Sequence, residues 1–440
     1  MWPSFPKRGF SLTTALMVLV ICMALTVAGL RQMAGVKGAQ VRRLQSLKAT
    51  WAAESGMAHA LRYLGNIQQW GELGGIDGKR FTWPSDQSAV VEVTPLMGYA
   101  RITVLGSCGS QQYKLEALAG QKPGRPGRFS LAIAEGPQPF FTSGQTRIEG
   151  DVSLPGGKLE SKALHGAPAS NMPVIQGRLS ASRPGDMPPS SPFDASAFTA
   201  LISQARTIIT TPPVIPDSPI WDLEGRTWRF AGDLTLPTHT LTIRGPGEIL
   251  VSGTLQIGHA LQLDSHPCLV SGGDLTIDGD VTLAATVIAG GTLTISGHTK
   301  GIASLISPQG IRIGPETRFD APSWCLLSSM SGIETTGRPA LMAEGQFNGL
   351  IATASYLRTQ PLVRITRQAN VQGAVYCQGR LILESPFKGS IWTRQFETLQ
   401  GARAFQNWLR DTQIEAPDSP AVALPFGFGE GARIVGWFSR

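Results

Sequence analysis

A long run without a charge, close to the amino terminus, is the strongest constraint on how this 440-residue chain can fold. Residues 10–30 read FSLTTALMVLVICMALTVAGL. At ~1.5 Å rise per residue, a helix of this length spans the ~30 Å hydrocarbon core of a bilayer. Only a short segment precedes the run, ending in Lys7, Arg8 and Gly9. The sequence therefore predicts a membrane-spanning helix at residues 10–30.

The helix is expected to continue past the span, to about residue 70. Large apolar residues recur at short helical steps in its second half, as in an amphipathic helix that buries one face. They are Leu44, Leu47, Trp51, Met57, Leu61 and Leu64. We therefore predict one long helix over residues 10–70. Its first part is apolar on all faces, and its second part is apolar on one face only.

Composition and charge placement exclude several classes of protein. Gly (51) and Pro (31) together make up 82 of the 440 residues, which argues against a mostly helical enzyme. The formal net charge is +7, but residues 1–60 hold seven basic residues against Glu54 alone, so the rest of the chain is close to neutral. The basic segment 42–48 follows the predicted span, where lipid headgroups explain it better than nucleic acid. No nucleic-acid partner is predicted.

Three common kinds of amino-terminal segment share this layout. A cleavable secretory signal peptide would end near Ala28, after the small-residue sequence TVA. A lipoprotein signal would place lipid on Cys22, although the bulky Ile21 precedes it. A plain signal anchor is the third, but basic residues flank both ends of the run and do not orient it cleanly.

A fourth interpretation comes from resemblance. The stretch KRGFSLTTALMVLVICMALTVAGL resembles the leader and helix of type IV prepilins, and AAESG at 52–56 is similar to the segment after that helix in minor pilins of the PilX kind. The resemblance covers residues 7 to about 62. It implies that residues 1–9 are a leader, which prepilin peptidase removes between Gly9 and Phe10. It also implies that one set of residues packs in the lipid bilayer and against other pilins or pseudopilins: Phe10, Leu12, Thr14, Leu16 and Leu19.

One position departs from the pattern that the resemblance implies. Pilins of this class usually have Glu at the fifth mature position, where its carboxylate pairs with the amino terminus of a neighbouring subunit. Here that position is Thr14. A charged amine without a partner is costly inside a membrane. The large K-type pseudopilin of type II secretion also lacks this Glu, so the resemblance favours a place at a filament tip or in priming assembly.

Residues 75–120 predict a small antiparallel β meander. Three strand-like pieces, QSAVVEVTP, YARITVLGS and QYKLEALAG, are separated by turn residues. The following QKPGRPGR, at 121–128, has the composition of a linker.

Internal repetition dominates the rest of the chain. GEILVSGTLQIG, PCLVSGGDLTIDG, TVIAGGTLTISG and ASLISPQGIRIG align at nearly even spacing, with Val251, Val270, Ala289 and Ser307 in one column. Later copies are looser, and LAIAEG at 131–136 resembles a first rung. Short alternating strands with Gly at the corners predict a single-stranded β-solenoid (β-helix) over residues 128–400, in a chain that is mainly β.

Two segments interrupt or end the predicted solenoid. Residues 155–222 are rich in Pro and Ser and read as an insertion with one helix, opened by an Asp194 cap. Residues 401–440 are apolar and aromatic, and we expect them to fold back as a carboxyl-terminal cap.

One polar column could carry chemistry. Asp280, His298 and Glu316 occupy the same place after the Gly turn in three consecutive repeats, so they could lie ~5 Å apart. Two carboxylates around a histidine could perform acid–base chemistry or hold a divalent cation. The alternative is that they are solvated corner residues, which is the interpretation we favour. No GxSxG, HExxH, Walker or dinucleotide-binding motif is present in the sequence, so no catalytic residue, metal or cofactor is predicted.

These observations favour a structural protein and not an enzyme: a minor pilin or pseudopilin of a type IV pilus or type II secretion system. It would cross the bacterial inner membrane once, hold its body in the periplasm, and contribute to assembly or adhesion. Two alternatives stay open. One is an anchored or secreted β-solenoid enzyme that acts on polysaccharide, and the other is a bactofilin-like scaffold that polymerises end to end.

Overall fold

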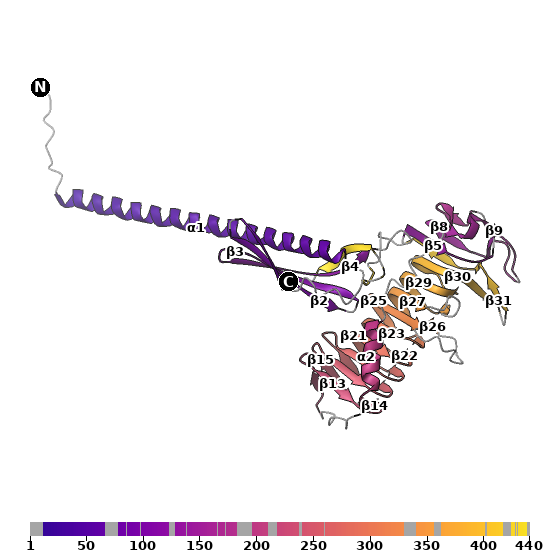
Figure 1. The fold of residues 1–440 in the computed structure, drawn as a ribbon. Helices are drawn as coiled ribbons and strands as arrows, with labels where there is room; N and C mark the ends of the chain where they lie inside the picture. The colour runs from indigo at the N-terminus through magenta and orange to yellow at the C-terminus, as the bar shows by residue number, and fades with distance from the viewer. Residues whose placement is uncertain are drawn as a thin grey trace. The chain divides into compact units, whose positions relative to one another are not determined.

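The structure is a computed structural model, shown in Figure 1. Two compact units can be distinguished: residues 1–60, 77–92 and 102–116 form one, and the rest of the chain forms the other. The described residues are 12–66, 78–84, 86–96, 98–122, 128–137, 139–164, 166–171, 173–182, 196–209, 218–236, 240–258, 260–329, 340–355, 362–400, 403–416, 424–426, 428 and 430–437.

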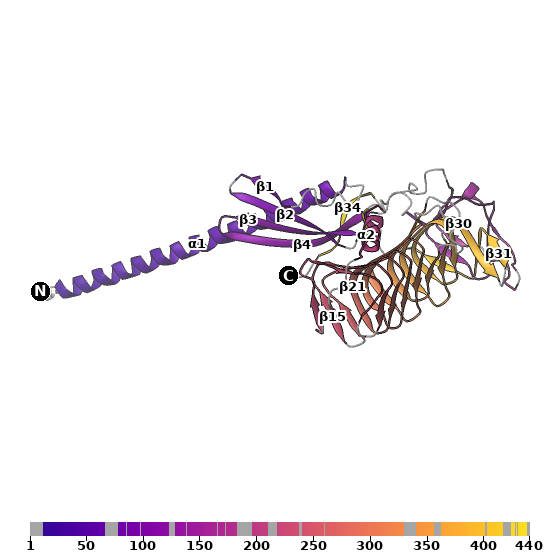
Figure 2. The ribbon, with the colours of Figure 1, turned by 60° about the horizontal axis from the view of Figure 1, so that its bottom comes forward.

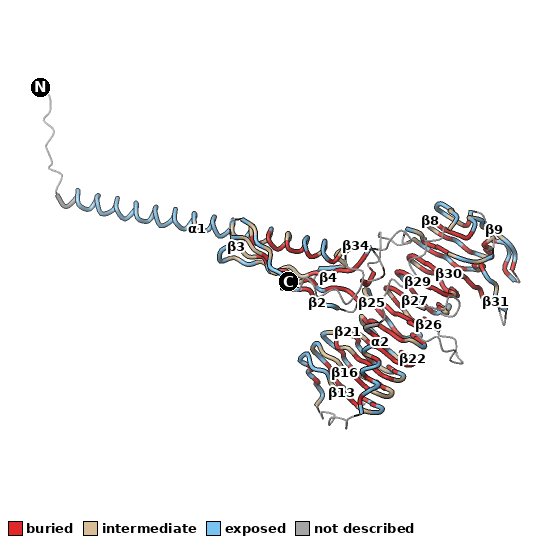
Figure 3. Tube along the Cα trace, viewed as in Figure 1, coloured by how far each residue is buried: buried red, intermediate tan, exposed pale blue. Residues whose placement is uncertain are grey.

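Helix α1 (Leu12–Leu64) is a single helix of 53 residues. At ~1.5 Å per residue it is about 80 Å long. The side chains described in its first half are exposed, whereas a stripe of its second half is buried (Figure 3). The predicted long helix is therefore confirmed within the described residues.

The buried stripe of α1 differs from the predicted one. Leu44, Leu47 and Trp51 are half or more exposed. The buried positions follow helical spacing but are mostly small: Ala49, Ala52, Ala53, Gly56, Met57, Ala60 and Leu64. The prediction is right at Met57 and Leu64 and wrong at the three exposed positions, because it counted only large apolar residues where this helix approaches a sheet too closely for them.

The small sheet contains β1 (Lys79–Trp83), β2 (Gln87–Leu96), β3 (Tyr99–Cys108), β4 (Gln111–Lys122) and β34 (Glu430–Trp437), in that order. It is the predicted antiparallel sheet with two further strands, since β1 pairs antiparallel with β2 and β34 pairs antiparallel with β4. All residues of the solenoid therefore lie, in the sequence, between two neighbouring strands of this sheet. Of the carboxyl-terminal segment, expected to fold back on the solenoid, Phe428 packs against Trp324 of β25 with ring centroids 6.2 Å apart, whereas β34 joins the small sheet.

The predicted β-solenoid is confirmed, with about 11 turns. Figure 2 shows its strands stacked in parallel. The strands of the main stack are β12 (Ile220–Asp222), β13 (Thr227–Phe230), β14 (Leu234–Thr235), β15 (Leu241–Arg244), β16 (Glu248–Val251), β17 (Leu255–Gly258), β18 (Leu261–Leu263), β19 (Cys268–Ser271), β20 (Leu275–Asp278), β21 (Val281–Ala289), β22 (Thr292–Ser296), β23 (Lys300–Ser307), β24 (Gly310–Ile313), β25 (Arg318–Ser329), β26 (Ala340–Ala343), β27 (Gln346–Ser355), β28 (Leu362–Ile365), β29 (Asn370–Leu383) and β30 (Phe387–Gln400).

The predicted alignment of the repeats is wrong by one residue at its second member. Val251 pairs with Ser271 and not with Val270, and Ser271 then pairs with Ala289. The first of these turns is longer than the second because Ser265 and His266 form an extra corner with positive φ angles of 62° and 64°. A slip of one residue moves a side chain to the opposite face of its strand.

The segment predicted as a first rung stacks elsewhere. Strand β5 pairs in parallel with β30, with Leu131 opposite Ile391, so residues 129–182 continue the stack beyond its last strand (Figure 1). The elements at this end are β5 (Phe129–Ile133), β6 (Phe140–Ser143), β7 (Arg147–Glu149), β8 (Asp151–Leu154), η3 (Pro155–Gly157), β9 (Leu159–Ser161), β10 (Ile175–Gln176), β11 (Leu179–Ala181), β31 (Arg403–Gln406), β32 (Trp408–Arg410) and β33 (Gln413–Glu415). Part of the predicted insertion thus belongs to the solenoid itself.

The solenoid is apolar inside and along one outer face. Its interior is filled by Leu, Ile, Val and Phe, such as Leu293 and Phe347. Helix α2 (Ser196–Arg206) lies on the outer face and packs Phe198 and Ile202 among apolar side chains of successive turns. The predicted helix is therefore present, while its proposed cap, Asp194, lies outside the described residues.

A ladder of glycines lets the long strands bend next to one another. Gly349, Gly373 and Gly389 pair in successive turns and have φ angles of 150°, 123° and 141°. A Cβ on Gly373 would lie 2.2 Å from the carbonyl oxygen of Gly349. Only glycine fits this close stacking, because every other residue carries a Cβ.

Candidate functional site

The first half of α1 is the leading candidate for a functional surface. Leu16 and Leu19 are 61% and 55% exposed, and α1 is long and apolar enough to cross a membrane. None of its most apolar stretch is buried. An exposed apolar surface of this extent marks a site of contact with a membrane or with another protein. Leu12 and Thr14 lie in the same helix, whereas Gly9 and Phe10 lie outside the described residues.

Charge begins where the apolar surface ends. Residues 12–30 of α1 carry no charge, and Arg31 is followed by four further basic residues before Glu54. Those residues are Lys37, Arg42, Arg43 and Lys48. An apolar cylinder followed by cationic turns matches a hydrocarbon layer bounded by anionic headgroups. The arrangement can hold this helix in a bilayer or against similar helices.

The second half of α1 is held at very short range against the sheet. A Cβ placed on Gly106 of β3 would lie 2.2 Å from the carbonyl oxygen of Ala49, and one on Gly56 would lie 2.8 Å from Val104. Ala52, Ala53 and Gly56 of the AAESG segment are buried, whereas Glu54 is exposed. The small residues of this segment therefore have a packing role, which the resemblance alone did not explain.

The polar column lies on the surface of the solenoid. Asp278 pairs with Ser296, which places Asp280 beside His298 two positions later. His298 Nε2 lies 4.0 Å from Glu316 Oε2, and these two side chains are 73% and 61% exposed. Among the residues that the structure describes, no group of three His, Cys, Asp or Glu could hold a metal ion. The three residues are neighbours, but solvent surrounds them.

The cysteines are free thiols, and most are buried. Burial raises the pKa of the Cys268 thiol to about 12 and raises the pKa values of Cys325 and Cys377. A protonated, buried thiol is a poor nucleophile and a poor metal ligand. The buried cysteines therefore act as small apolar side chains.

Two features of the solenoid surface were missed by sequence reasoning. One is the outer apolar face under α2, although runs of three apolar residues such as Ile249, Leu250 and Val251 signal strands buried on both faces. The other is a cavity of about 410 Å³, whose lining includes Arg367, Glu384, Arg410 and Asp411. No sequence signal identifies this cavity, because its residues come from separate segments of the chain.

Comparisons with known proteins do not assign this chain to a family. No protein-family model matches the sequence, and a search of curated proteins gives no match either. Among solved structures, the chain is similar to the competence-associated pilin ComZ from Thermus thermophilus, with 13% sequence identity, a TM-score of 0.20, and coverage of 90% of this chain and 97% of that one. Similarity at this level supports no inference about fold or function.

Proposed function

We propose that this chain is a structural subunit of a type IV filament or type II pseudopilus, of the minor pilin or large pseudopilin kind, and not an enzyme. The observation that carries the proposal is the division of α1 into an uncharged first segment with exposed apolar side chains and a second half packed against a small sheet. A subunit that leaves a membrane to join a filament needs both: an apolar helix that exchanges lipid for neighbouring helices, and a rigid attachment to its body.

The proposal includes a place in the cell. The uncharged segment of α1, residues 12–30, would cross the bacterial inner membrane once, with the sheet and the solenoid in the periplasm before assembly. The basic residues from Arg31 to Lys48 would face anionic headgroups at the exit of the span. The partners are the lipid bilayer, other pilins or pseudopilins, and prepilin peptidase.

Processing at the Gly9–Phe10 bond is the direct test. Mass spectrometry of the mature protein should find a methylated Phe10 as the first residue in cells that contain prepilin peptidase. Gly9→Val should retain the leader, whereas Gly29→Val, in a part of α1 with no atom within 4 Å of a Cβ, should be processed normally. Cleavage after Ala28, or normal processing of Gly9→Val, would contradict the proposal.

The residue at the fifth mature position supports a place at the filament tip. Thr14 has no carboxylate to pair with the amino terminus of a subunit ahead of it, and an unpaired amine is costly in an apolar core. A tip subunit has no subunit ahead of it and does not need the pair. The solenoid would then be displayed at the end of the filament for assembly or adhesion.

Immunogold labelling tests the tip position. Antibody against the solenoid should label filament ends, and Thr14→Glu should allow labelling along the shaft, while Thr13→Glu, one position away on the helix, should not. Even labelling of the shaft by the unaltered protein would remove the tip proposal and leave the subunit class intact.

A further inference from the structure

A cavity of about 410 Å³ opens near the end of the solenoid where β30 and β31 form a hairpin. Its wall includes Thr398 and Leu399 of the hairpin, and Leu383 and Glu384 at the end of β29. Small-molecule sites are typically ~300–1,000 Å³ in volume. The cavity therefore has room for a small ligand.

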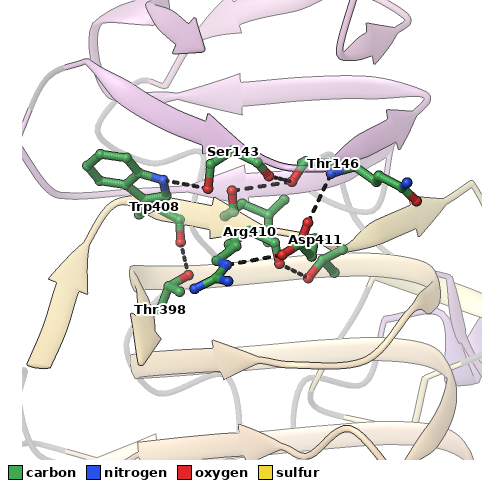
Figure 4. A network of polar contacts seen from close by, with 9 residues as sticks. Ser143, Thr146, Thr398, Trp408, Arg410 and Asp411 are labelled. Atoms are coloured by element: carbon green, nitrogen blue, oxygen red, sulfur yellow. Dashed lines mark hydrogen bonds and ion pairs between the residues drawn. The ribbon is translucent and has the colours of Figure 1, made fainter. Parts of the chain in front are cut away.

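Hydrogen bonds to distant parts of the chain hold the side of the cavity that carries Arg410 and Asp411 (Figure 4). Asp411 accepts from Arg410 Nε at 3.0 Å and from the backbone N–H of Gln145 at 3.1 Å. Thr398 Oγ1 donates to the carbonyl of Trp408, and Trp408 Nε1 donates to Ser143 Oγ at 3.1 Å. The polar lining is thus preorganised.

The charges of the lining cancel, but its carboxylates are already hydrogen-bonded, whereas its arginines still have N–H donors without an acceptor among the described residues. Two arginines, Arg367 and Arg410, face two carboxylates, Glu384 and Asp411. Both carboxylates are engaged, since Arg364 also donates to Glu384 through Nε at 3.1 Å and Nη2 at 3.3 Å.

The arginines have donors left over. No described residue pairs with the exposed guanidinium of Arg367, and Arg410 uses only Nε within the described part of the chain. Unused guanidinium donors favour a carboxylate, which matches their planar geometry.

The remaining lining indicates the rest of the ligand. Each carboxylate has about four acceptor positions, and the bonds above occupy two on Glu384 and two on Asp411, so hydroxyl groups can still donate to both. Ile382 and Leu399 add an apolar part to the lining. A ligand with a carboxylate, several hydroxyls and an apolar face fits all three features.

We propose that this cavity binds a uronic acid unit of an acidic polysaccharide, with its carboxylate on Arg367 and Arg410 and its ring on the apolar part of the lining. The site is a property of the solenoid and does not depend on the leader or on filament assembly. It would give an exposed solenoid a ligand, and it goes beyond the structural role proposed above.

Isothermal titration of the full chain in detergent micelles, with trigalacturonate as the probe, tests the site. We expect saturable binding that neutral galactotriose does not reproduce. Arg367→Gln should weaken it by about tenfold or more, the effect of losing a charge-assisted hydrogen bond. Arg229→Gln is the matched control, because Arg229 is exposed on β13 in a different part of the solenoid.

Several results would overturn the proposal. They are no binding at millimolar trigalacturonate, equal binding of the neutral trisaccharide, and equal affinities of Arg367→Gln and Arg229→Gln. Equal binding of N-acetyl-leucine, a carboxylate without sugar hydroxyls, would overturn the assignment to sugars. Mass spectrometry of the mature amino terminus is independent of all of these, so a failure here leaves the filament proposal standing.

Discussion

The contact between α1 and the small sheet and the core of the solenoid are built from opposite kinds of residue. The helix buries mainly Ala and Gly, and Gly106 allows its backbone to approach β3 within contact distance. The solenoid core buries Leu, Ile, Val and Phe. Small residues gain little from burial but impose a close and unique fit, whereas large ones gain stability from the area removed from water. The two regions should therefore fail in different ways.

The largest effect is expected from a cavity in the solenoid core. Phe347 is fully buried, with its ring centroid 5.9 Å from that of Phe319. Phe347→Ala should lower the free energy of unfolding of the solenoid by about 3–5 kcal/mol. Urea denaturation, monitored by hydrogen exchange of the solenoid strands, measures this loss of free energy. Trp437→Ala, at an exposed aromatic residue, is the control, and an equal loss in both variants would contradict this description of the core.

Overpacking is the matching test of the helix contact. Gly106→Val should cost about 2–3 kcal/mol, because its Cβ would meet backbone atoms of Ala49 and Ala53 that cannot move separately from the helix. Hydrogen exchange should rise in residues 49–64 and stay unchanged in the solenoid. Gly35→Val has open space and should change neither. If Gly106→Val loosened the solenoid instead, the separation between the two regions would be wrong.

The outer face of the solenoid should respond to alkaline pH. Burial raises the pKa of Tyr376 to about 12, above the ordinary value near 10. The protonated Tyr376 hydroxyl therefore contributes its full stabilisation below about pH 10. This stabilisation is lost as the pH rises toward 12, by at most ~1.4 kcal/mol per pH unit. Tyr376→Phe should remove this part of the pH dependence, measured as urea midpoints at pH 9 and 11. Parallel losses in both proteins would show that Tyr376 is not the group concerned.

A smaller effect is expected where α2 covers that face. Arg206 donates to the carbonyls of Gly272 at 2.8 Å and Gly290 at 3.0 Å, which belong to successive turns. Arg206→Ala should cost about 1 kcal/mol and increase hydrogen exchange in α2. Gln204→Ala, at an exposed position of the same helix, should have no effect. Equal protection of α2 in the two variants would argue against a fastening role for Arg206.

The smallest effect is expected in the polar column. Glu316→Gln removes an exposed pair with His298 that spans 4.0 Å, so the free energy of unfolding should change by less than ~0.5 kcal/mol. Thermal unfolding of Glu316→Gln beside the unaltered protein measures this. A loss above ~1 kcal/mol, the upper end for exposed pairs, would mean that the column is more than a solvated corner.

Local patterns in the sequence predicted the element types well. The long uncharged run at 10–30 can form little other than an apolar helix, and short alternating strands with Gly corners can bury their apolar residues by stacking. The register of the repeats was harder to predict, because the extra corner at Ser265 and His266 displaced an alignment that assumed nearly constant spacing. The neighbouring positions of Asp280, His298 and Glu316 could be predicted, since the later turns keep an even spacing.

Local patterns in the chain thus account for the apolar helix, the small antiparallel sheet and the repeating strands. That β5 stacks on β30, that β34 joins β4, and that Arg367 and Arg410 line one cavity is seen only in the folded molecule. A strand edge offers hydrogen bonds to any strand of suitable length, so pairing partners distant in the chain leave no periodic signal. The choice among them is made by side chains that meet only after the chain has folded.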